Sequence, residues 1–116
     1  TRLMEADSRI IWLGWVNSKD LQGYLCAADV YLQPGTQSAT LQVAMCCGLS
    51  VVIYPYFSHR PYLNGNGFYV ESENDLQKVF EAISDNPQVL SNMGIRSQEI
   101  AKDLLDYRKL ASRLYR

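Results

Sequence analysis

Four short apolar runs are separated by longer, more polar segments in the first part of the chain. Each run is rich in β-branched or aromatic residues, and glycine or proline follows most of them, which is typical of buried strands. The third run is β-branched without interruption, as expected for a strand covered on both faces. The predicted strands are Ile10–Leu13, Val30–Gln33, Val51–Tyr54 and Phe68–Val70.

The segments between the first three strands show the apolar spacing of helices. The first helix would be capped by Asn17 or Ser18, and its apolar face consists of Leu21, Tyr24, Leu25 and Ala28. The second helix begins at Ser38 or Thr40 and ends at Gly48, a residue suited to a left-handed C-terminal cap. Apolar side chains surround this second helix almost completely, so we expect it to be buried between layers.

After Val70 the spacing is helical to the end of the chain. Asn86 and Pro87 are suited to the cap and the first position of a helix, and Gly94 is suited to its end. The predicted helices are one with the apolar face Leu76, Val79, Phe80 and Ile83, one from Pro87 to Gly94, one from Ile95 to Leu105, and a last one capped by Asp106.

This order of elements predicts an α/β fold. Strands joined by crossovers of ten or more residues are parallel, so we expect a Rossmann-like parallel sheet of about four strands with a helical C-terminal third. No repeat or linker-like stretch divides the chain, and residues 1–116 therefore form a single domain, with an α/β part at 1–71 and a helical tail at 72–116. Ligands of such sheets bind beyond the carboxyl ends of the strands.

Composition excludes several classes of protein. The 116 residues are 47% hydrophobic and 20% charged, with a net charge of −1, which suits one globular domain and does not suit a nucleic-acid-binding protein. No apolar run is long enough to span a membrane, and the first residues lack the apolar core of a signal peptide. Three cysteines without a CxxC motif indicate reduced core thiols in a cytoplasmic protein.

The segment from Pro34 to Thr40 is the most informative for function, because it joins a strand end to the buried helix. Gly35 would let the backbone approach a ligand, and hydroxyls with the first N–H groups of the helix could hold a phosphate. The alternative is a polar turn in which Ser38 is a simple cap. The segment is neither a GxGxxG motif nor a Walker loop.

Other polar residues have simpler interpretations. His59 and Arg60 follow the third strand and could meet an anion, although an exposed loop histidine is the more common case. The acidic residues Glu71, Glu73 and Asp75 are better explained by the positive end of a helix than by a metal site, and we assign no metal ligands. Trp12 and Trp15 are predicted to pack in the core. Basic side chains near the C-terminus would suit an anionic inner membrane surface, but interspersed acidic residues favour a solvated face.

Four stretches in order resemble the C-terminal half of a GT-B glycosyltransferase, especially the retaining group 1 family. The first, Ile11–Val16, resembles that family's "hydrophobic-x-F-L-G-x-V" strand, and Leu21–Asp29 resembles its "L-x-x-L/Y-x-x-A-D" helix. Val30–Val52 is similar to "D-V-x-x-x-P-S…E-A-M-A-x-G-x-P-V-V", through its Ala44–Val52 part, and Asn64–Val70 is similar to "D-G-x-N-G-F-L-V". The tail is similar to the family's helical end at Asp106-Tyr107 and Leu114-Tyr115.

The resemblance implies that the chain binds a nucleotide-diphosphate sugar, expected to be UDP-linked, as a substrate rather than a cofactor. The expected donor-binding residues are Gly14, Gly35, Thr36, Gln37, Ser38 and Thr40, with Gln42, His59 and Arg60 as further candidates. No residue is assigned a catalytic role.

The chain also departs from the family's pattern. Where the family has a glutamate that holds the nucleotide ribose, this chain has Val43, and Gln42 beside it points about 100° away on a helix. The family's first glutamate falls at Gly35, with Gln37 or Ser38 as substitutes, and its usual proline is Ser50. Donor binding is therefore altered, or catalysis is lost.

Two strands that begin the family's C-terminal half, and the acceptor-binding N-terminal half, have no counterpart in this sequence. The missing strands would lie between Ile10–Leu13 and Val30–Gln33. We therefore expect the first strand to pair with another element or with a second copy in a strand-swapped dimer, and the chain alone to be inactive. Two alternatives remain: a degenerate structural or regulatory domain, and a relative of UDP-sugar 2-epimerases, for which His59 is the one available strand-end histidine.

Overall fold

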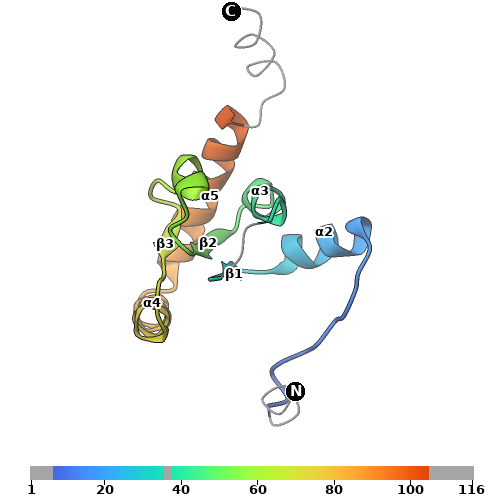
Figure 1. The fold of residues 1–116 in the computed structure, drawn as a ribbon, viewed down its shortest axis with the longest axis horizontal. Helices are drawn as coiled ribbons and strands as arrows, with labels where there is room; N and C mark the ends of the chain where they lie inside the picture. Colours follow the sequence, from blue (N-terminus) through green and yellow to red (C-terminus); the bar gives the residue numbers. More distant parts are fainter. Residues whose placement is uncertain (1–6, 36–37, 105–116) are drawn as a thin grey trace, which may run out of the picture.

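A computed structural model describes residues 7–35 and 38–104 (Figure 1). Thr36 and Gln37 of the predicted phosphate loop lie outside the described residues, as does the helix predicted after Asp106. Within the described part of the chain, no helix has both the length and the apolar character needed to cross a membrane.

A parallel sheet of three strands forms the centre of the structure, in the order β1-β2-β3. Its strands are β1 (Val30–Gln33), β2 (Ser50–Ile53) and β3 (Gly67–Tyr69). Val30 lies opposite Ser50, and Val51 lies opposite Gly67. Every residue of β2 is buried, as the sequence predicted for a central strand covered on both faces.

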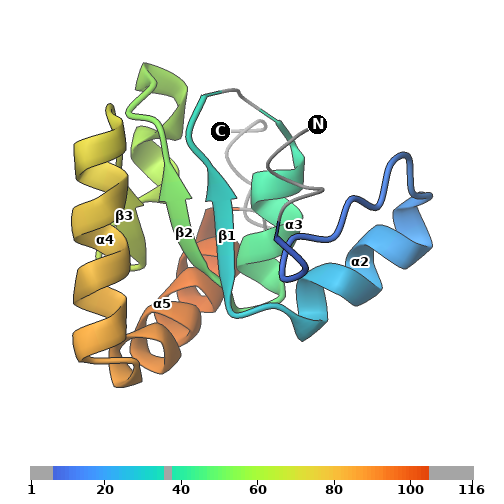
Figure 2. The same ribbon diagram turned by 90° about the horizontal axis from the view of Figure 1, so that it is seen from below.

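Helices cover both faces of the sheet (Figure 2). The helices α3 (Thr40–Cys46) and α5 (Gln88–Leu104) pack on the face that carries Val51 and Ile53. The helix α4 (Glu73–Asp85) packs on the opposite face, where Val52 contacts a cluster with Val70 and Val79. Since successive strand residues point to opposite faces, the apolar run of β2 supplies both halves of the core.

The helix α2 (Ser18–Ala27) lies beside α3 rather than on the sheet (Figure 2). Asn17 caps it, because the side-chain oxygen of Asn17 accepts a hydrogen bond of 2.8 Å from the backbone N–H of Asp20. One apolar cluster attaches α2 to the rest of the fold: Leu25 packs there with Ala44 and Leu49.

The strand predicted at Ile10–Leu13 does not form. These residues are irregular, and their apolar side chains are exposed. The prediction that Trp12 and Trp15 lie in the core is also wrong, since their exposed fractions are 76% and 102%. A strand is stable only when a neighbour completes its hydrogen bonds, and within the described residues β1 pairs with β2 alone.

The helical region differs from the prediction at Gly94, where one continuous α5 replaces two shorter helices. Gly94 is buried, and a Cβ atom there would lie 2.2 Å from the carbonyl oxygen of Gly48. The glycine therefore allows α5 to cross the end of α3 closely and does not end a helix. Gly48 itself has a φ of +81°, which confirms its role as a left-handed cap.

Two expectations about burial are corrected on α3. Its apolar residues are not all buried, because Val43 is 40% exposed and Cys46 is exposed, while Leu41, Ala44 and Met45 face the core. The three cysteines are free thiols as expected, but they are not core residues: Cys26 and Cys46 are exposed and Cys47 is partly buried.

Candidate functional site

A pocket of about 380 Å³ lies at the carboxyl ends of β1 and β2, where the sequence predicted the ligand site. It is formed between the start of α3 and the short 3₁₀ helix η1 (Phe57–Tyr62), which follows β2. Figure 2 shows both segments at the end toward which the strand arrows point. The lining residues are Ser38, Ala39, Leu41, Gln42, Ser58, His59 and Tyr62.

These lining side chains supply hydroxyl, amide and imidazole groups and no carboxylate. A negatively charged ligand would therefore find hydrogen-bond donors in the lining and would not be repelled by a carboxylate there. The volume lies within the range of pockets that bind small molecules, which is roughly 300–1,000 Å³.

Ser38 organises the turn into α3. Its hydroxyl donates to Thr40 Oγ1 over 3.0 Å and accepts a bond of 3.2 Å from the backbone N–H of Thr40. The N–H of Leu41 donates to the Ser38 carbonyl, and that of Gln42 donates to the Ala39 carbonyl. Ser38 is therefore part of a polar turn but is not the cap, since the N-cap of α3 is Ala39 without a side-chain capping bond. A phosphate held by these N–H groups would have to replace bonds within the turn.

Gln42 faces the pocket and Val43 does not. The Nε2 atom of Gln42 donates to the hydroxyl of Tyr62 over 3.0 Å, which joins α3 to η1 across the pocket. Val43 is not among the lining residues. The rotation of about 100° between neighbouring helix positions therefore brings the amide, rather than the valine, to the site.

His59 is buried, with 4% of its surface exposed, and the expectation of an exposed loop histidine is wrong. Its Nδ1 lies 2.8 Å from the carbonyl oxygen of Tyr54. Because a carbonyl only accepts hydrogen bonds, Nδ1 is the donor in this bond and carries a proton. Burial occurs because η1 folds the chain back over the end of β2.

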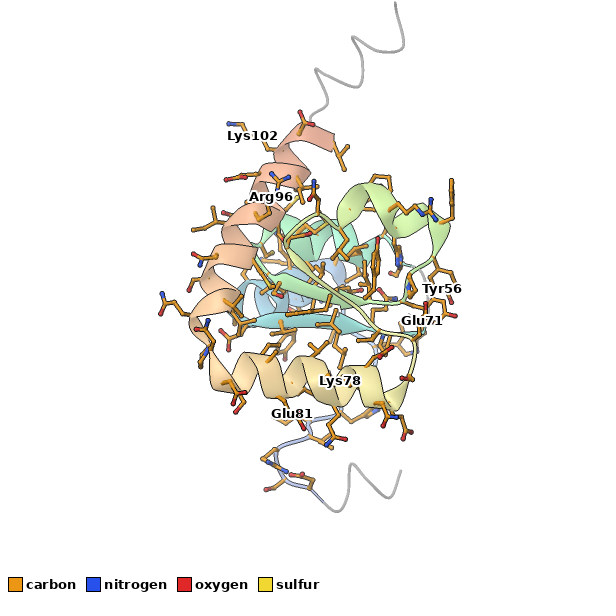
Figure 3. The ribbon with its side chains drawn as sticks, turned by 90° about the vertical axis from the view of Figure 1, so that its left-hand side faces the viewer. Tyr56, Glu71, Lys78, Glu81, Arg96 and Lys102 are labelled. Carbon is orange, nitrogen blue, oxygen red and sulfur yellow. The ribbon has the colours of Figure 1, made fainter. Side chains whose placement is uncertain are left out.

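Tyr56 is a residue that the sequence analysis did not single out. Its hydroxyl donates to the carbonyl of Gly35 over 2.8 Å, so it fixes the loop after β1 to the loop after β2. Its ring also contacts Tyr54 and meets His59 edge-on, with centroids 4.7 Å and 5.4 Å away. The position of Tyr56 directly after a predicted strand was the available signal, and Figure 3 shows it at the same end of the sheet as Glu71.

Four of the predicted residues that the structure describes are not among those that line the pocket: Gly14, Gly35, Thr40 and Arg60. Gly14 lies in the exposed segment before α2, where its φ is +67°. Arg60 is exposed, and its guanidinium carbon lies 4.8 Å from the ring centroid of Phe57. The structure therefore brings together Ser38, Gln42 and His59 from the predicted set, with Gly35 held nearby by Tyr56.

The acidic residues after β3 act at the start of α4, as the sequence indicated. Ser72 caps the helix by accepting a bond of 3.2 Å from the N–H of Asp75. The carboxylate of Asp75 in turn accepts a bond of 3.0 Å from the N–H of Glu71. No group of three or more histidine, cysteine or acidic side chains suited to a metal ion occurs among residues 7–35 and 38–104.

These features define an α/β domain with a Rossmann-like parallel sheet and a pocket at the carboxyl ends of its strands. A comparison with protein families matches residues 1–86 to the family described as glycosyl transferases group 1. The chain belongs to this family of group 1 glycosyltransferases, which confirms the resemblance seen in its motifs. No curated protein and no solved structure gives a significant match to the chain.

Proposed function

We propose that this chain is the donor side of a glycosyltransferase and binds a nucleotide-diphosphate sugar, UDP-linked, in the pocket between α3 and η1. The observation that carries the proposal is the set of hydroxyl, amide and imidazole side chains, without a carboxylate, that lines the pocket at the carboxyl ends of β1 and β2. Membership of the group 1 glycosyltransferases supplies the reaction class.

The roles of the residues follow from their contacts. The hydroxyls of Ser38 and Thr40 lie at the entry to α3 and can turn from each other to donate to a diphosphate oxygen. Gln42 and Tyr62 already share a hydrogen bond and offer an amide and a phenol to the ribose or the sugar. Such fixed donors would stabilise the charge of the departing diphosphate in the complete enzyme.

A second candidate function has one observation in its favour. Val43 occupies the position at which the family's pattern has a ribose-binding glutamate, and it lies outside the pocket lining. Together with the bonded N–H groups at the start of α3, this favours a non-catalytic domain that binds no nucleotide. The family match favours the transferase over an epimerase.

Calorimetric titration with UDP tests the proposal. We expect millimolar UDP to bind the chain, and Gln42→Ala to weaken binding about five- to ten-fold, the effect of one hydrogen bond worth about 1 kcal/mol. Gln77→Ala is the matched control, because Gln77 lies on α4 and bonds with Glu81 far from the pocket. No heat with UDP would favour the non-binding domain, and equal weakening by both variants would contradict binding of UDP in this pocket.

We expect the chain alone to bind donor without transferring sugar. The described residues that line the pocket include no carboxylate, and His59 is the one side chain among them that could act as a general base. The acceptor site would come from a partner domain of the complete enzyme.

A further inference from the structure

Two of the three thiols lie in direct contact across the interface between α2 and α3. The Sγ atoms of Cys26 and Cys47 are 3.0 Å apart, although the residues are separated by β1 and the whole loop into the pocket. A disulfide has a sulfur–sulfur distance of about 2.05 Å, so the sulfurs need to approach by about 1 Å. The two side chains already point toward each other.

We propose that Cys26 and Cys47 are a site of oxidative modification, at which a peroxide joins them in a disulfide that links α2 to α3. This inference rests on the contact between the two helices and is independent of donor binding. The bond would close residues 26–47 into a covalent loop that contains β1 and the segment leading to Ser38.

The exposures of the two thiols assign the order of the steps. Cys26 is exposed and meets the peroxide first: its sulfur attacks one peroxide oxygen, the O–O bond breaks, and a sulfenic acid and one water form. The sulfur of Cys47 then attacks the sulfur of Cys26, the S–O bond breaks, and a second water leaves. In total, two thiols and one peroxide give one disulfide and two waters.

Cys47 is suited to the second step rather than the first. Burial, followed by the contact with Cys26, raises the pKa of the Cys47 thiol to about 11. It is therefore a poor nucleophile toward a free oxidant. In the second step its proximity to the Cys26 sulfur compensates for this low reactivity.

Cys46 provides a control within the same chain. It precedes Cys47 directly but is exposed, and neighbouring positions on a helix point about 100° apart. The geometry therefore selects Cys47 over Cys46 as the partner of Cys26.

The test is mass spectrometry of the chain after treatment with hydrogen peroxide. Trypsin leaves all three cysteines in one peptide, because no lysine or arginine lies between Lys19 and Arg60. Cleavage before aspartate separates residues 20–28 from 29–74, so the disulfide appears as a linked pair of peptides that reduction separates. The mass of the intact chain should fall by that of two hydrogens, and no disulfide should join two chains.

We expect Cys46→Ser to keep the linked pair, and Cys26→Ser and Cys47→Ser to lose it. Cys47→Ser changes a partly buried side chain and could disturb the fold. Cys26→Ser changes an exposed side chain, so it should leave the fold intact and tests the link by itself. A link from Cys26 to Cys46, a link between two chains, or oxidation of Cys26 to sulfinic acid without a link would overturn the proposal.

Discussion

Ser97 joins three parts of the fold through one buried hydroxyl. Its Oγ donates to the carbonyl of Leu49 over 2.6 Å, before β2, and accepts a bond of 3.1 Å from Asn66 Nδ2. Asn66, also buried, bonds to the carbonyl of Tyr62 at the end of η1. The position of η1, and with it one wall of the pocket, therefore depends on this pair.

Replacing Ser97 by alanine should lower the free energy of unfolding by about 1–3 kcal/mol, because it leaves the Leu49 carbonyl and the Asn66 amide buried without this partner. Chemical denaturation followed by circular dichroism measures the change. Ser84→Ala is the control, since Ser84 is exposed on α4 and its replacement should change stability by less than about 0.5 kcal/mol. Equal effects of the two variants would contradict the role of Ser97.

The sequence predicted the roles of some individual residues and missed those of others. Caps such as Asn17 and Gly48 were predictable, because their chemistry is local. The burial of Asn66 was not predictable, because the helix that covers it lies far along the chain. The same reason explains His59, which a fold-back after β2 buries.

Elements with strong local patterns form where the sequence placed them. The strand Val30–Gln33 matches its predicted bounds, and the two later strands shift by one residue. The helix α5 differs from its prediction, because Gly94 was predicted to end a helix and instead lies inside α5, where it contacts the Gly48 carbonyl. A local pattern does not distinguish these two roles, since both require the absence of a side chain.

Replacing two helical glycines by alanine should change stability in opposite directions, because only Gly94 lies where α5 crosses the end of α3. Gly94→Ala should lower stability by about 2 kcal/mol, because its Cβ would overlap the Gly48 carbonyl oxygen. Gly23→Ala, on the exposed side of α2, meets no atom within 4 Å and should raise stability by about 0.5–1 kcal/mol through helix propensity. Thermal unfolding compares them, and a stabilising Gly94→Ala would contradict the close crossing.

At the scale of the whole molecule, the exposed segment before α2 is the main difference from the predicted fold. Ile11, Trp12 and Trp15 are largely solvent-exposed, and among residues 7–35 and 38–104 no strand pairs with the edge of β1 that lies away from β2. The strand predicted there from composition does not form, because pairing is decided by a neighbour that a local pattern does not contain. An unpaired strand edge favours addition of a strand from another element.

We expect this segment to pair with a second copy of the chain, giving a dimer in sedimentation velocity experiments. Ile11→Ser with Trp12→Ser should shift the chain to monomer without lowering its unfolding free energy, because these side chains are exposed in the single chain. Lys78→Ser, on α4, is the control and should leave the dimer unchanged. A chain that stays monomeric at all concentrations would contradict the pairing.

The central claim is that the pocket between α3 and η1 holds a nucleotide diphosphate, and amide chemical-shift mapping during a UDP titration tests it most directly. The account predicts that the amides of Ser38, Thr40 and Gln42, together with those of η1, shift progressively to saturation, while those of α4 stay in place. Shifts confined to other surfaces, or no shift at millimolar UDP, would contradict it.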